Sequence, residues 1–389
     1  MCYSSRLLLL IVFCVGCLRT CLYAQWVFDD DGCRTPDRGS GNCVPLKECK
    51  PMVQVLESLK RPISGTILKR LQAYTCGPNG DSVKVCCPQN PIIILEPTNE
   101  INTEPPDVSG HRNINLLPSD CGYLNSDNRI INGEDAAINE FPWMALIRYN
   151  GTKKGELRFK CGGTIINKNY ILTAAHCIAA LTNSRIDSVR VGEHSIKNQT
   201  DCEIVNKKLK CNPPVQDLRI EQVIPHPKFG ARSFLNDIGL LRVSTMNLNV
   251  ENVRPVCLPL GRERTKTYDS VFVTGWGVTN TNTGETSDIL QKVKLPIADK
   301  NSCTNTYNNN NIKLVHTQIC AGGVHNKDSC PGDSGGPMMV TSINQELTAV
   351  YIQQGIVSFG PKYCGIPGYP GVYTLTKYYM DWILDNLRP

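Results

Sequence analysis

Short apolar runs separated by turn residues dominate the chain from residue 130 onward. The runs read WMALIRY, GGTIINKNYILTAAHC, VRVGEH, VFVTGWG, YIQQGIVSFG and GVYTL, and Gly, Asn and Pro lie between them. They are rich in β-branched and aromatic residues. This pattern predicts many short antiparallel strands, and therefore a β-sandwich or a β-barrel.

The C-terminal stretch has a different period. Tyr379, Trp382, Ile383 and Leu387 recur at helical spacing within residues 376–387. We therefore expect an amphipathic helix that packs on the β-structure.

The N-terminus has the layout of a secretory signal. A basic residue precedes an apolar run over residues 7–15, and cleavage is expected before Gln25. The run is shorter than the roughly 20 residues that span a bilayer. A retained signal anchor is the alternative, which Gly16 and Arg19 disfavour because they interrupt the apolar sequence. The mature chain is thus predicted to be secreted and extracellular, without membrane association.

Cysteine usage agrees with an oxidising compartment. Four of the 20 cysteines lie within the first 24 residues, which leaves an even number, 16. Zinc binding is the competing use, but Cys86 and Cys87 are adjacent and no paired C-x-x-C units occur. Disulfides are therefore the favoured interpretation.

Two regions precede the β-rich part. Six cysteines fall within residues 33–87, a span too short to build a sufficient hydrophobic core unaided, so a small disulfide-stapled module is expected. Prolines then recur through residues 88–120 and predict an extended, proteolytically accessible linker.

The charge balance is mild. Charged residues make up 20% of the chain, the formal net charge is +6, and no long block of Lys and Arg occurs. These values argue against a nucleic-acid-binding protein.

Three segments carry candidate catalytic side chains: LTAAHC with His176, FLNDIGLLRV with Asp237 and GDSGGP with Ser334. Acyl transfer by serine needs a base beside the hydroxyl, an acid that orients this base, and N–H donors for the oxyanion. Each residue alone has an ordinary explanation, as a core histidine, a turn aspartate or part of a glycine-rich turn. A buried carboxylate nevertheless needs a hydrogen-bonding partner, because burying it unpaired is costly.

Taken in this order, the three contexts resemble the chymotrypsin-like serine proteases over residues 130–387, and the six-cysteine module resembles a clip domain. The whole chain is thus similar to arthropod clip-domain serine proteases of the prophenoloxidase-activating and easter-like type. The resemblance implies an all-β fold of two six-stranded antiparallel β-barrels with a C-terminal helix, preceded by a small disulfide-rich clip domain. The implied parts are a signal peptide (1–24), a mature N-terminus (25–32), the clip domain (33–87), a Pro-rich linker and activation segment (88–129) and the protease domain (130–389).

The resemblance also implies catalytic roles. Ser334 would attack the scissile carbonyl, His176 would take and return the proton, and Asp237 would hold the imidazole. The backbone N–H groups of Gly332 and Ser334 would form the oxyanion hole, where glycine allows unusual backbone angles.

A primary specificity pocket is implied by Asp328 at its base and by Gly360 and Gly371 in its walls. A carboxylate there would pair with Arg or Lys of a substrate. Two positions depart from the commonest pattern. Pro331 stands where relatives often have a polar residue, but its missing N–H is not one of the oxyanion donors. Phe359 stands where Trp is common.

Activation is expected by cleavage between Arg129 and Ile130, after which the new ammonium of Ile130 would pair with Asp333. An arginine at this site calls for an upstream trypsin-like protease. The predicted function is a secreted zymogen in the haemolymph that cleaves proproteins after Arg or Lys in an innate-immune cascade. Prophenoloxidase (melanisation) and a Spätzle-like precursor (Toll signalling) are the substrates considered, and a serpin is the expected inhibitor.

Two other functions stay open at this point. One is a non-proteolytic cofactor or binding protein that works through the clip domain, and the other is a digestive or venom trypsin. The complete set of His176, Asp237 and Ser334 weighs against the first, and the clip domain and linker weigh against the second.

The resemblance implies eight disulfides, although six clip cysteines alone allow 15 pairings. The pairs are Cys33–Cys86, Cys43–Cys76, Cys49–Cys87, Cys121–Cys257, Cys161–Cys177, Cys202–Cys211, Cys303–Cys320 and Cys330–Cys364.

Two lesser sites are suggested. Asn150 and Asn198 begin glycosylation sequons on expected loops. Glu193 and Asp201 flank a loop where some relatives bind calcium, but a solvated loop explains two carboxylates equally well, because Ca²⁺ usually takes six to eight oxygens. No cofactor is required for the predicted chemistry.

Overall fold

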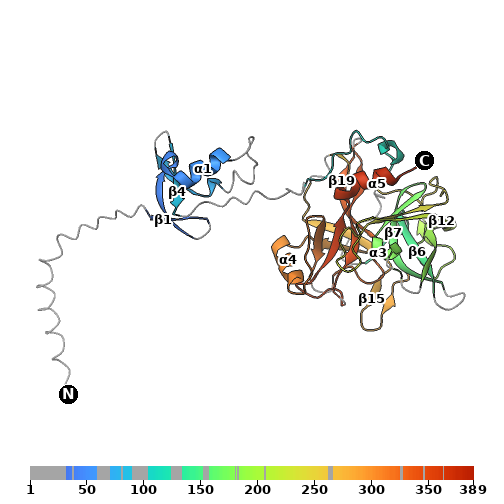
Figure 1. Ribbon diagram of the computed structural model, residues 1–389. Coiled ribbons are helices and arrows are strands. Elements are labelled where there is room, and N and C mark those ends of the chain that lie inside the picture. The colour runs from blue at the N-terminus through green and yellow to red at the C-terminus, as the bar shows by residue number, and fades with distance from the viewer. Residues whose placement is uncertain are drawn as a thin grey trace, which may run out of the picture. The chain divides into compact units, whose positions relative to one another are not determined.

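The computed structural model describes residues 32–36, 39–58, 71–79, 82–89, 104–123, 134–151, 157–179, 181, 184–205, 207–261, 266–324, 327–344, 347–361 and 363–389. The chain divides into two compact units, Met1–Ile101 and Asn102–Pro389 (Figure 1). The predicted signal peptide and the Arg129–Ile130 bond lie outside the described residues. No helix among the described residues is long and apolar enough to cross a membrane.

The first unit is a small sheet with one helix. Its antiparallel strands follow the order β1 (Gly32–Arg34), β2 (Ser40–Pro45), β4 (Ser82–Pro88) and β3 (Thr75–Asn79), with the 3-10 turn η1 (Leu46–Glu48) and helix α1 (Lys50–Ser58). Its core is small and centres on Met52, Tyr74 and Val85. Three disulfides, Cys33–Cys86, Cys43–Cys76 and Cys49–Cys87, connect the strands and the start of the helix. Such bridges stabilise a domain too small for a large core, chiefly by restricting the unfolded chain.

One half of the second unit is a closed barrel of six antiparallel strands. Their cyclic order is β12 (Gln216–Pro225), β13 (Gly239–Val243), β8 (Tyr170–Thr173), β7 (Leu157–Asn167), β6 (Met144–Asn150) and β9 (Arg185–Val191). All four residues of β8 are buried, so buried and exposed residues do not alternate along this strand.

The other half is a seven-stranded sheet. Its order is β18 (Gln318–Gly322), β21 (Pro370–Leu375), β20 (Ala349–Phe359), β19 (Pro337–Ile343), β14 (Ser270–Gly275), β17 (Gln291–Pro296) and β5 (Glu134–Asp135). A bridge between Ile297 and Ala321 joins the end of β17 to β18, so six of the strands curl into a half-barrel. The two-barrel prediction is thus confirmed in outline. It missed the seventh strand, which forms because Glu134 pairs with Lys292 on the free edge of β17.

Helices are few and short among the described residues of this unit. They are α3 (Ala175–Ala179), α4 (Lys300–Asn308) and α5 (Met380–Asn386), with the 3-10 turns η2 (Ile114–Leu116) and η4 (Thr376–Tyr379). The predicted C-terminal helix is therefore present, but its first turn is a 3-10 turn. Ile383 and Leu387 are fully buried against the first barrel's core cluster, as their spacing predicted.

The prediction of an accessible linker over residues 88–120 is wrong for residues 104–120. This segment packs on the protease unit, where Val108 is only 4% exposed. The amide of Asn113 donates to the backbone carbonyl of Leu384 at 2.8 Å, and the amide of Asn167 donates to the carbonyl of Leu116 at 3.1 Å. The segment is made of turns, bends and the 3-10 turn η2 rather than an extended backbone, and its proline content did not reveal that side chains attach it to the body.

A buried ion pair connects the two halves of the protease unit. Lys292 on β17 donates to both carboxylate oxygens of Glu140 at 2.9 and 2.8 Å, and each side chain is 5% exposed. The backbone N–H of Ala137 also donates to Glu140 at 2.8 Å. This arrangement satisfies the carboxylate, so loss of its charge would leave the lysine as an uncompensated buried cation.

Glu140→Gln is therefore expected to lower the unfolding free energy by about 3 kcal/mol. Thermal denaturation followed by circular dichroism measures the effect. The exposed pair Lys210–Glu251, with an N–O distance of 2.6 Å, offers a matched control, because Glu251→Gln should leave the melting temperature unchanged. Equal shifts for the two variants would contradict a structural role for the buried pair.

Candidate active site

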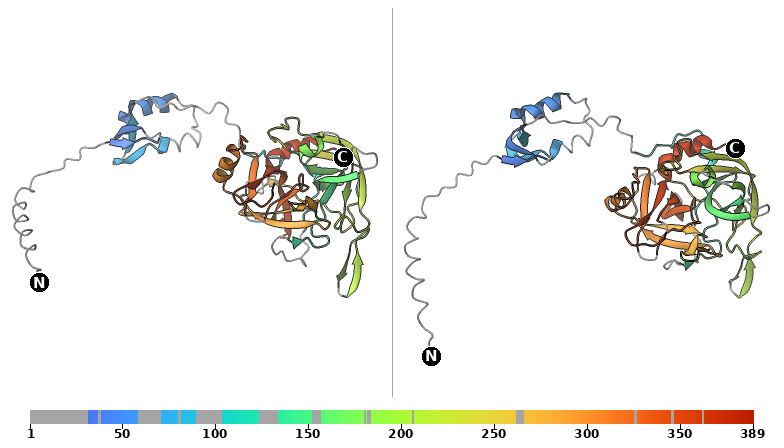
Figure 2. Two further views of the ribbon diagram at one scale, coloured as in Figure 1. Left: turned by 90° about the horizontal axis from the view of Figure 1, so that it is seen from below. Right: turned by 60° about the horizontal axis from the view of Figure 1, so that its bottom comes forward.

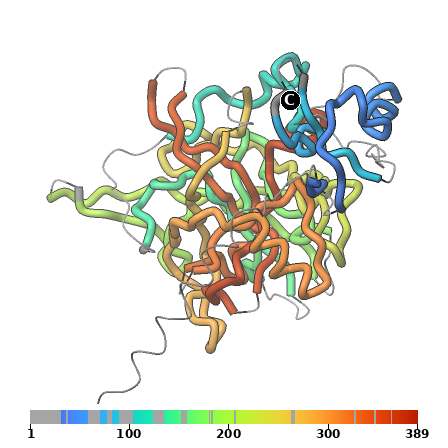
Figure 3. The backbone as a smooth tube through the Cα atoms, turned by 90° about the vertical axis from the view of Figure 1, so that its left-hand side faces the viewer, coloured from blue at the N-terminus to red at the C-terminus, as the bar shows by residue number. Residues whose placement is uncertain are grey.

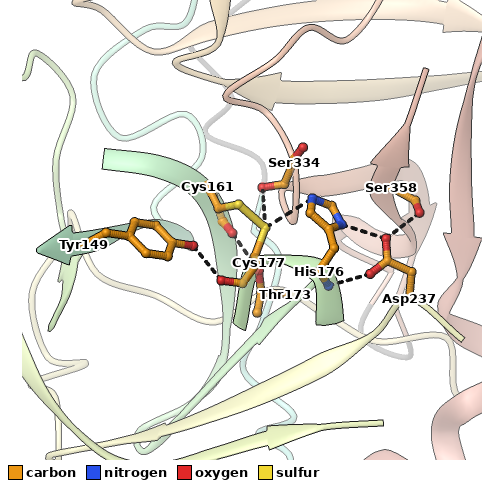
Figure 4. Close-up of a disulfide and its surroundings, with 9 residues drawn as sticks. Tyr149, Cys161, Thr173, His176, Cys177, Asp237, Ser334 and Ser358 are labelled. Carbon is orange, nitrogen blue, oxygen red and sulfur yellow. Dashed lines mark hydrogen bonds and ion pairs between the residues drawn. A yellow bond between two sulfur atoms is a disulfide. The ribbon is translucent and has the colours of Figure 1, made fainter. Parts of the chain in front are cut away.

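His176 and Asp237 are brought together across the first barrel. His176 lies in α3, directly after β8, and Asp237 lies two residues before β13, which pairs with β8. The Nδ1 atom of His176 is 2.8 Å from Oδ2 of Asp237, and the backbone N–H of His176 donates to Oδ1 at 2.8 Å (Figure 4). Two contacts to one carboxylate fix the ring's position. They also indicate that Nδ1 carries the proton and leave Nε2 as the basic nitrogen.

Asp237 is completely buried, yet it is well hydrogen-bonded. The hydroxyl of Ser358 donates to its carboxylate, and the hydroxyl of Thr374 donates to its backbone carbonyl at 2.9 Å. The costly burial expected for a lone carboxylate is thus offset by the Ser358 hydroxyl from β20 and by the two contacts from His176. Ser358 was not predicted from the sequence as a partner of Asp237. Its position directly before the aromatic Phe359 was the only local feature that could have indicated this role.

Ser334 lies in the loop between β18 and β19, beside the His176 ring and the Cys161–Cys177 disulfide (Figure 4). Its backbone carbonyl accepts from Gly162 of β7 at 2.8 Å, which attaches the loop to the first barrel. Within the described part of the chain, no hydrogen bond joins the Ser334 hydroxyl to His176. Such bonds are often long in unliganded enzymes and shorten when substrate binds.

The loop before Ser334 has a backbone conformation that requires glycine at position 332. Gly332 has a φ of 105°, and a Cβ atom there would lie 2.9 Å from the Cα of Gly277, so another residue would be both strained and crowded. The carbonyl of Pro331 accepts from the N–H of Val278 at 2.9 Å. This bond anchors the turn to the hairpin of β15 (Val278–Asn280) and β16 (Glu285–Thr286), and it needs no N–H from Pro331.

The three predicted pocket residues lie together. A Cβ atom on Gly371 would lie 3.1 Å from Oδ1 of Asp328, and one on Gly360 would lie 3.6 Å from the Cα of Gly371. The carboxylate accepts from the N–H groups of Ser329 at 2.9 Å and Gly365 at 3.4 Å. Burial raises the pKa of Asp328 to about 6. The glycines therefore leave space beside a partly desolvated carboxylate.

Several pocket side chains were missed from the sequence. The hydroxyls of Ser329 and Tyr373 lie 3.0 Å apart and line the same space, since a Cβ atom on Gly371 would contact both. Phe234 packs on His176 with ring centroids 5.8 Å apart and on Phe359 at 5.0 Å. Its φ of 52° is rare for a bulky residue. Only its position three residues before Asp237 could have been a signal.

Asp333 occupies the same loop, directly before Ser334. Its carboxylate accepts from the N–H groups of Gly277 and Cys330, both at 2.8 Å. Burial raises the pKa of Asp333 to about 6, because two neutral donors do not replace a cation. The carboxylate lines a cavity of about 450 Å³ that also reaches Asp328 and Lys292. Its predicted partner, Ile130, lies outside the described residues.

Disulfides connect the loops around this site. Those of the second unit are Cys121–Cys257, Cys161–Cys177, Cys202–Cys211, Cys303–Cys320 and Cys330–Cys364. With the three clip bridges, all eight pairs are the ones that the resemblance implied.

The two acidic residues considered for calcium are buried and already hydrogen-bonded. Glu193 accepts from Arg190 at 3.3 Å and from the N–H of His194 at 3.0 Å. Asp201 accepts from the N–H groups of His194 and Ser195 at 3.1 and 3.2 Å. A guanidinium in contact with Glu193 and oxygens occupied by donors do not fit a site for Ca²⁺, which takes six to eight free oxygens.

Both sequon asparagines are exposed. Asn150 ends β6, and Asn198 follows the turn that begins at Ser195. Glycosylation of these residues stays a prediction.

Comparison with known proteins agrees with this geometry. A family model described as Trypsin matches residues 130–383, and one described as Regulatory CLIP domain of proteinases matches residues 33–87. Phenoloxidase-activating factor 1 of Holotrichia diomphalia is 37% identical over 367 residues, covering 92% of this chain and 94% of that protein. Melanization protease 1 of Drosophila melanogaster is 37% identical over 390 residues, covering 94% and 95%.

A solved structure resembles the chain over nearly its whole length. The Drosophila Grass clip serine protease of the Toll pathway superimposes with a TM-score of 0.63 at 33% identity, covering 91% of this chain and 96% of that one. The protein therefore belongs to the trypsin family of serine proteases and carries the regulatory clip domain of its clip-domain members.

Proposed function

We propose that the chain is the secreted zymogen of a trypsin-like serine endopeptidase, activated by cleavage after Arg129. The observation that carries this proposal is the His176 ring, which the buried Asp237 holds through two 2.8 Å contacts beside Ser334. If His176 were only a core residue and Ser334 only part of a surface turn, the fold would not need a buried carboxylate that orients the histidine beside the serine. Eight disulfides support an oxidising, extracellular location.

The proposed chemistry follows from the geometry. Nε2 of His176 accepts the hydroxyl proton of Ser334 as Oγ bonds to the substrate's carbonyl carbon, and the carbonyl electron pair moves to oxygen. The N–H groups of Gly332 and Ser334 stabilise that oxyanion. Its electron pair then re-forms the carbonyl and the C–N bond breaks, while the imidazolium donates its proton to the leaving amine. Water attacks the acyl-enzyme in the same way and restores Ser334. Asp237 stabilises the imidazolium throughout without being protonated.

Specificity for Arg or Lys is proposed on the carboxylate of Asp328. The glycines beside it leave room for a long side chain, and the hydroxyls of Ser329 and Tyr373 offer further acceptors. A cation would compensate the desolvated carboxylate, which makes its pairing in this pocket favourable.

Activation is proposed to complete the loop around Ser334. The α-amino group of Ile130, once freed, would supply the cation that the Asp333 carboxylate lacks among its described contacts. An ion pair there would hold Gly332 and Ser334 in place, because Asp333 lies between them in sequence.

The physiological role is proposed from the relatives. Proteins named Phenoloxidase-activating factor and Melanization protease, and a Grass protease of the Toll pathway, resemble the chain along more than nine-tenths of its length. We place the protein in such a haemolymph cascade, with an upstream trypsin-like activator, a proprotein substrate cut after Arg or Lys, and serpin inhibition. Prophenoloxidase and a Spätzle-like precursor are the substrates to test.

Controlled cleavage tests the proposal. In a full chain whose residues 125–129 are replaced by the enteropeptidase sequence DDDDK, the cut protein should begin at Ile130 and hydrolyse an arginine amide. The uncut chain should be inactive. Equal activity before and after the cut would contradict zymogen activation, and inactivity in both states would contradict the protease itself.

The pKa of Asp328 predicts a pH dependence for cation binding in the pocket. Below its pKa of about 6 the carboxyl is protonated and neutral, so the affinity for p-aminobenzamidine should fall as pH decreases through this value and be constant above it. Fluorescence titration measures this affinity independently of His176. Asp328→Asn should weaken binding at least about 30-fold at pH 8 and remove the pH dependence. An unchanged profile in that variant would exclude Asp328 as the recognition group.

A further inference from the structure

A two-stranded hairpin extends from the protease unit. It consists of β10 (Cys202–Val205) and β11 (Lys208–Cys211), which pair only with each other among the described strands. Two views show it as a green arm that leaves the body near β9 and β12 (Figures 2 and 3). An isolated hairpin has no hydrophobic core of its own and is at best marginally stable in water.

One face of this hairpin is apolar although it faces solvent. Ile204 and Leu209 are directly opposite each other in the register, and they are 77% and 71% exposed. The Cys202–Cys211 disulfide lies on the same face, two residues away on each strand. Nothing in the described structure covers this pair, so the fold does not explain two large aliphatic side chains here.

The hairpin is held rigidly despite its exposure. The disulfide closes its base, and the N–H of Asn212 donates to the carbonyl of Asp201 at 2.8 Å. The side chain of Asn139 donates to that of Asn212 at 2.8 Å, and the buried Asp201 carboxylate accepts from the body at His194 and Ser195. A preorganised pair of aliphatic side chains loses little conformational entropy on binding.

The turn of the hairpin is basic. Lys207 and Lys208 form the turn side of the hairpin, and no described residue forms an ion pair with either of them. Lys210 is neutralised by Glu251 at 2.6 Å, and Glu203 faces Lys210 across the strands. The positive charge available to a partner is therefore concentrated at the tip, next to the apolar pair.

We propose that Ile204, Leu209, Lys207 and Lys208 form a docking ridge for a protein partner. The complementary segment presents aliphatic or aromatic side chains to Ile204 and Leu209 and carboxylates to the two lysines at the tip. A second copy of this chain is disfavoured, because the formal charge of +6 makes copies repel one another. A membrane is disfavoured because two aliphatic side chains are fewer than stable anchoring needs.

Binding of designed peptides to the full chain tests this ridge. The probe is a labelled peptide of alternating leucines followed by a run of glutamates, measured by fluorescence anisotropy. It should bind the unmodified protein, and its affinity should fall at least about tenfold with Ile204→Ser/Leu209→Ser and with Lys207→Glu/Lys208→Glu. Added salt should weaken binding to the unmodified protein more than to the lysine variant.

Matched controls distinguish the ridge from general stickiness. Ile343→Ser/Leu347→Ser removes two aliphatic side chains that are 66% and 86% exposed on another hairpin, and it should leave peptide binding unchanged. A peptide with lysines in place of glutamates should bind at least about tenfold more weakly. Equal loss of affinity in the control variant, or equal binding of both peptides, would overturn the proposal.

Two further measurements separate the other occupants. Vesicles of phosphatidylcholine and phosphatidylserine test binding to a membrane by co-sedimentation, and analytical ultracentrifugation tests self-association. The proposal would be overturned if either of these depended on Ile204 and Leu209 while peptide binding did not. Arginine-amide hydrolysis by the cut protein should be unchanged in all ridge variants. Loss of peptide binding with intact hydrolysis therefore tests the ridge separately from the proposed protease activity.

Discussion

Ser334→Ala in the chain cut after residue 129 should reduce arginine-amide hydrolysis by about 10⁴-fold or more. Its Oγ is the proposed nucleophile, and Ser334 lies beside the His176 ring in the close-up of the site (Figure 4). Removing one member of a group that acts as a unit costs nearly as much as removing the whole group. Active-site titration with a chloromethyl ketone and kcat measurements would follow the loss.

The same variant is expected to fold normally. The Ser334 backbone carbonyl, which holds the loop to Gly162, is retained, and no described hydrogen bond of the hydroxyl is lost. Binding of p-aminobenzamidine should therefore equal that of the unmodified enzyme. Persistent hydrolysis in a variant that binds the ligand normally would remove Ser334 from the mechanism.

Asp237→Asn should lower kcat by about 10⁴-fold while leaving pocket binding intact. The carboxylate accepts from the backbone N–H and from Nδ1–H of His176, and also from the Ser358 hydroxyl. An asparagine side chain has only one oxygen for these three donors. Its NH₂ group would face Nδ1 as a donor, so the imidazole would place its proton on Nε2. In that tautomer, Nε2 cannot accept the proton of Ser334.

Ser358→Ala provides the graded control for this prediction. It removes one donor to Asp237 but leaves both His176 contacts, so its effect on kcat should be at least about tenfold smaller than that of Asp237→Asn. The ratio of kcat to KM for an arginine amide, measured across pH, compares the two variants. Similar losses in both would mean that the carboxylate acts mainly through packing.

Local motifs predicted a large part of this site. The contexts of His176, Asp237 and Ser334 identify the family because each of these side chains lies in a short motif of adjacent residues, TAAHC, NDIGLL and GDSGGP. The same holds for Gly332, whose φ of 105° only glycine adopts easily. Six closely spaced cysteines likewise predicted a small disulfide-stapled module, since the span is too short to build a sufficient hydrophobic core, and the resemblance identified this module as a clip domain.

Contacts between residues far apart in the sequence could not be predicted from local motifs. Ser358 reaches Asp237 across 121 residues of sequence, and the Tyr373 hydroxyl meets Ser329 across 44. Neither carries a local signal, because serine and tyrosine are ordinary in strands. The attachment of residues 104–123 was missed for the same reason: it depends on a contact between the Asn113 amide and the carbonyls of Leu384 and Leu387 at the end of α5.

By itself, the sequence determined the order of the domains, the family, the reactive side chains and the cysteines available for pairing, because these depend on residue type and local spacing. Only the tertiary structure decided which donors satisfy the buried Asp237, that Glu140 and Lys292 form a buried pair, and that Ile204 and Leu209 stay uncovered. Burial and partnership belong to the whole fold: the same aliphatic residue is core in one strand and an exposed ridge in another, according to what packs against it.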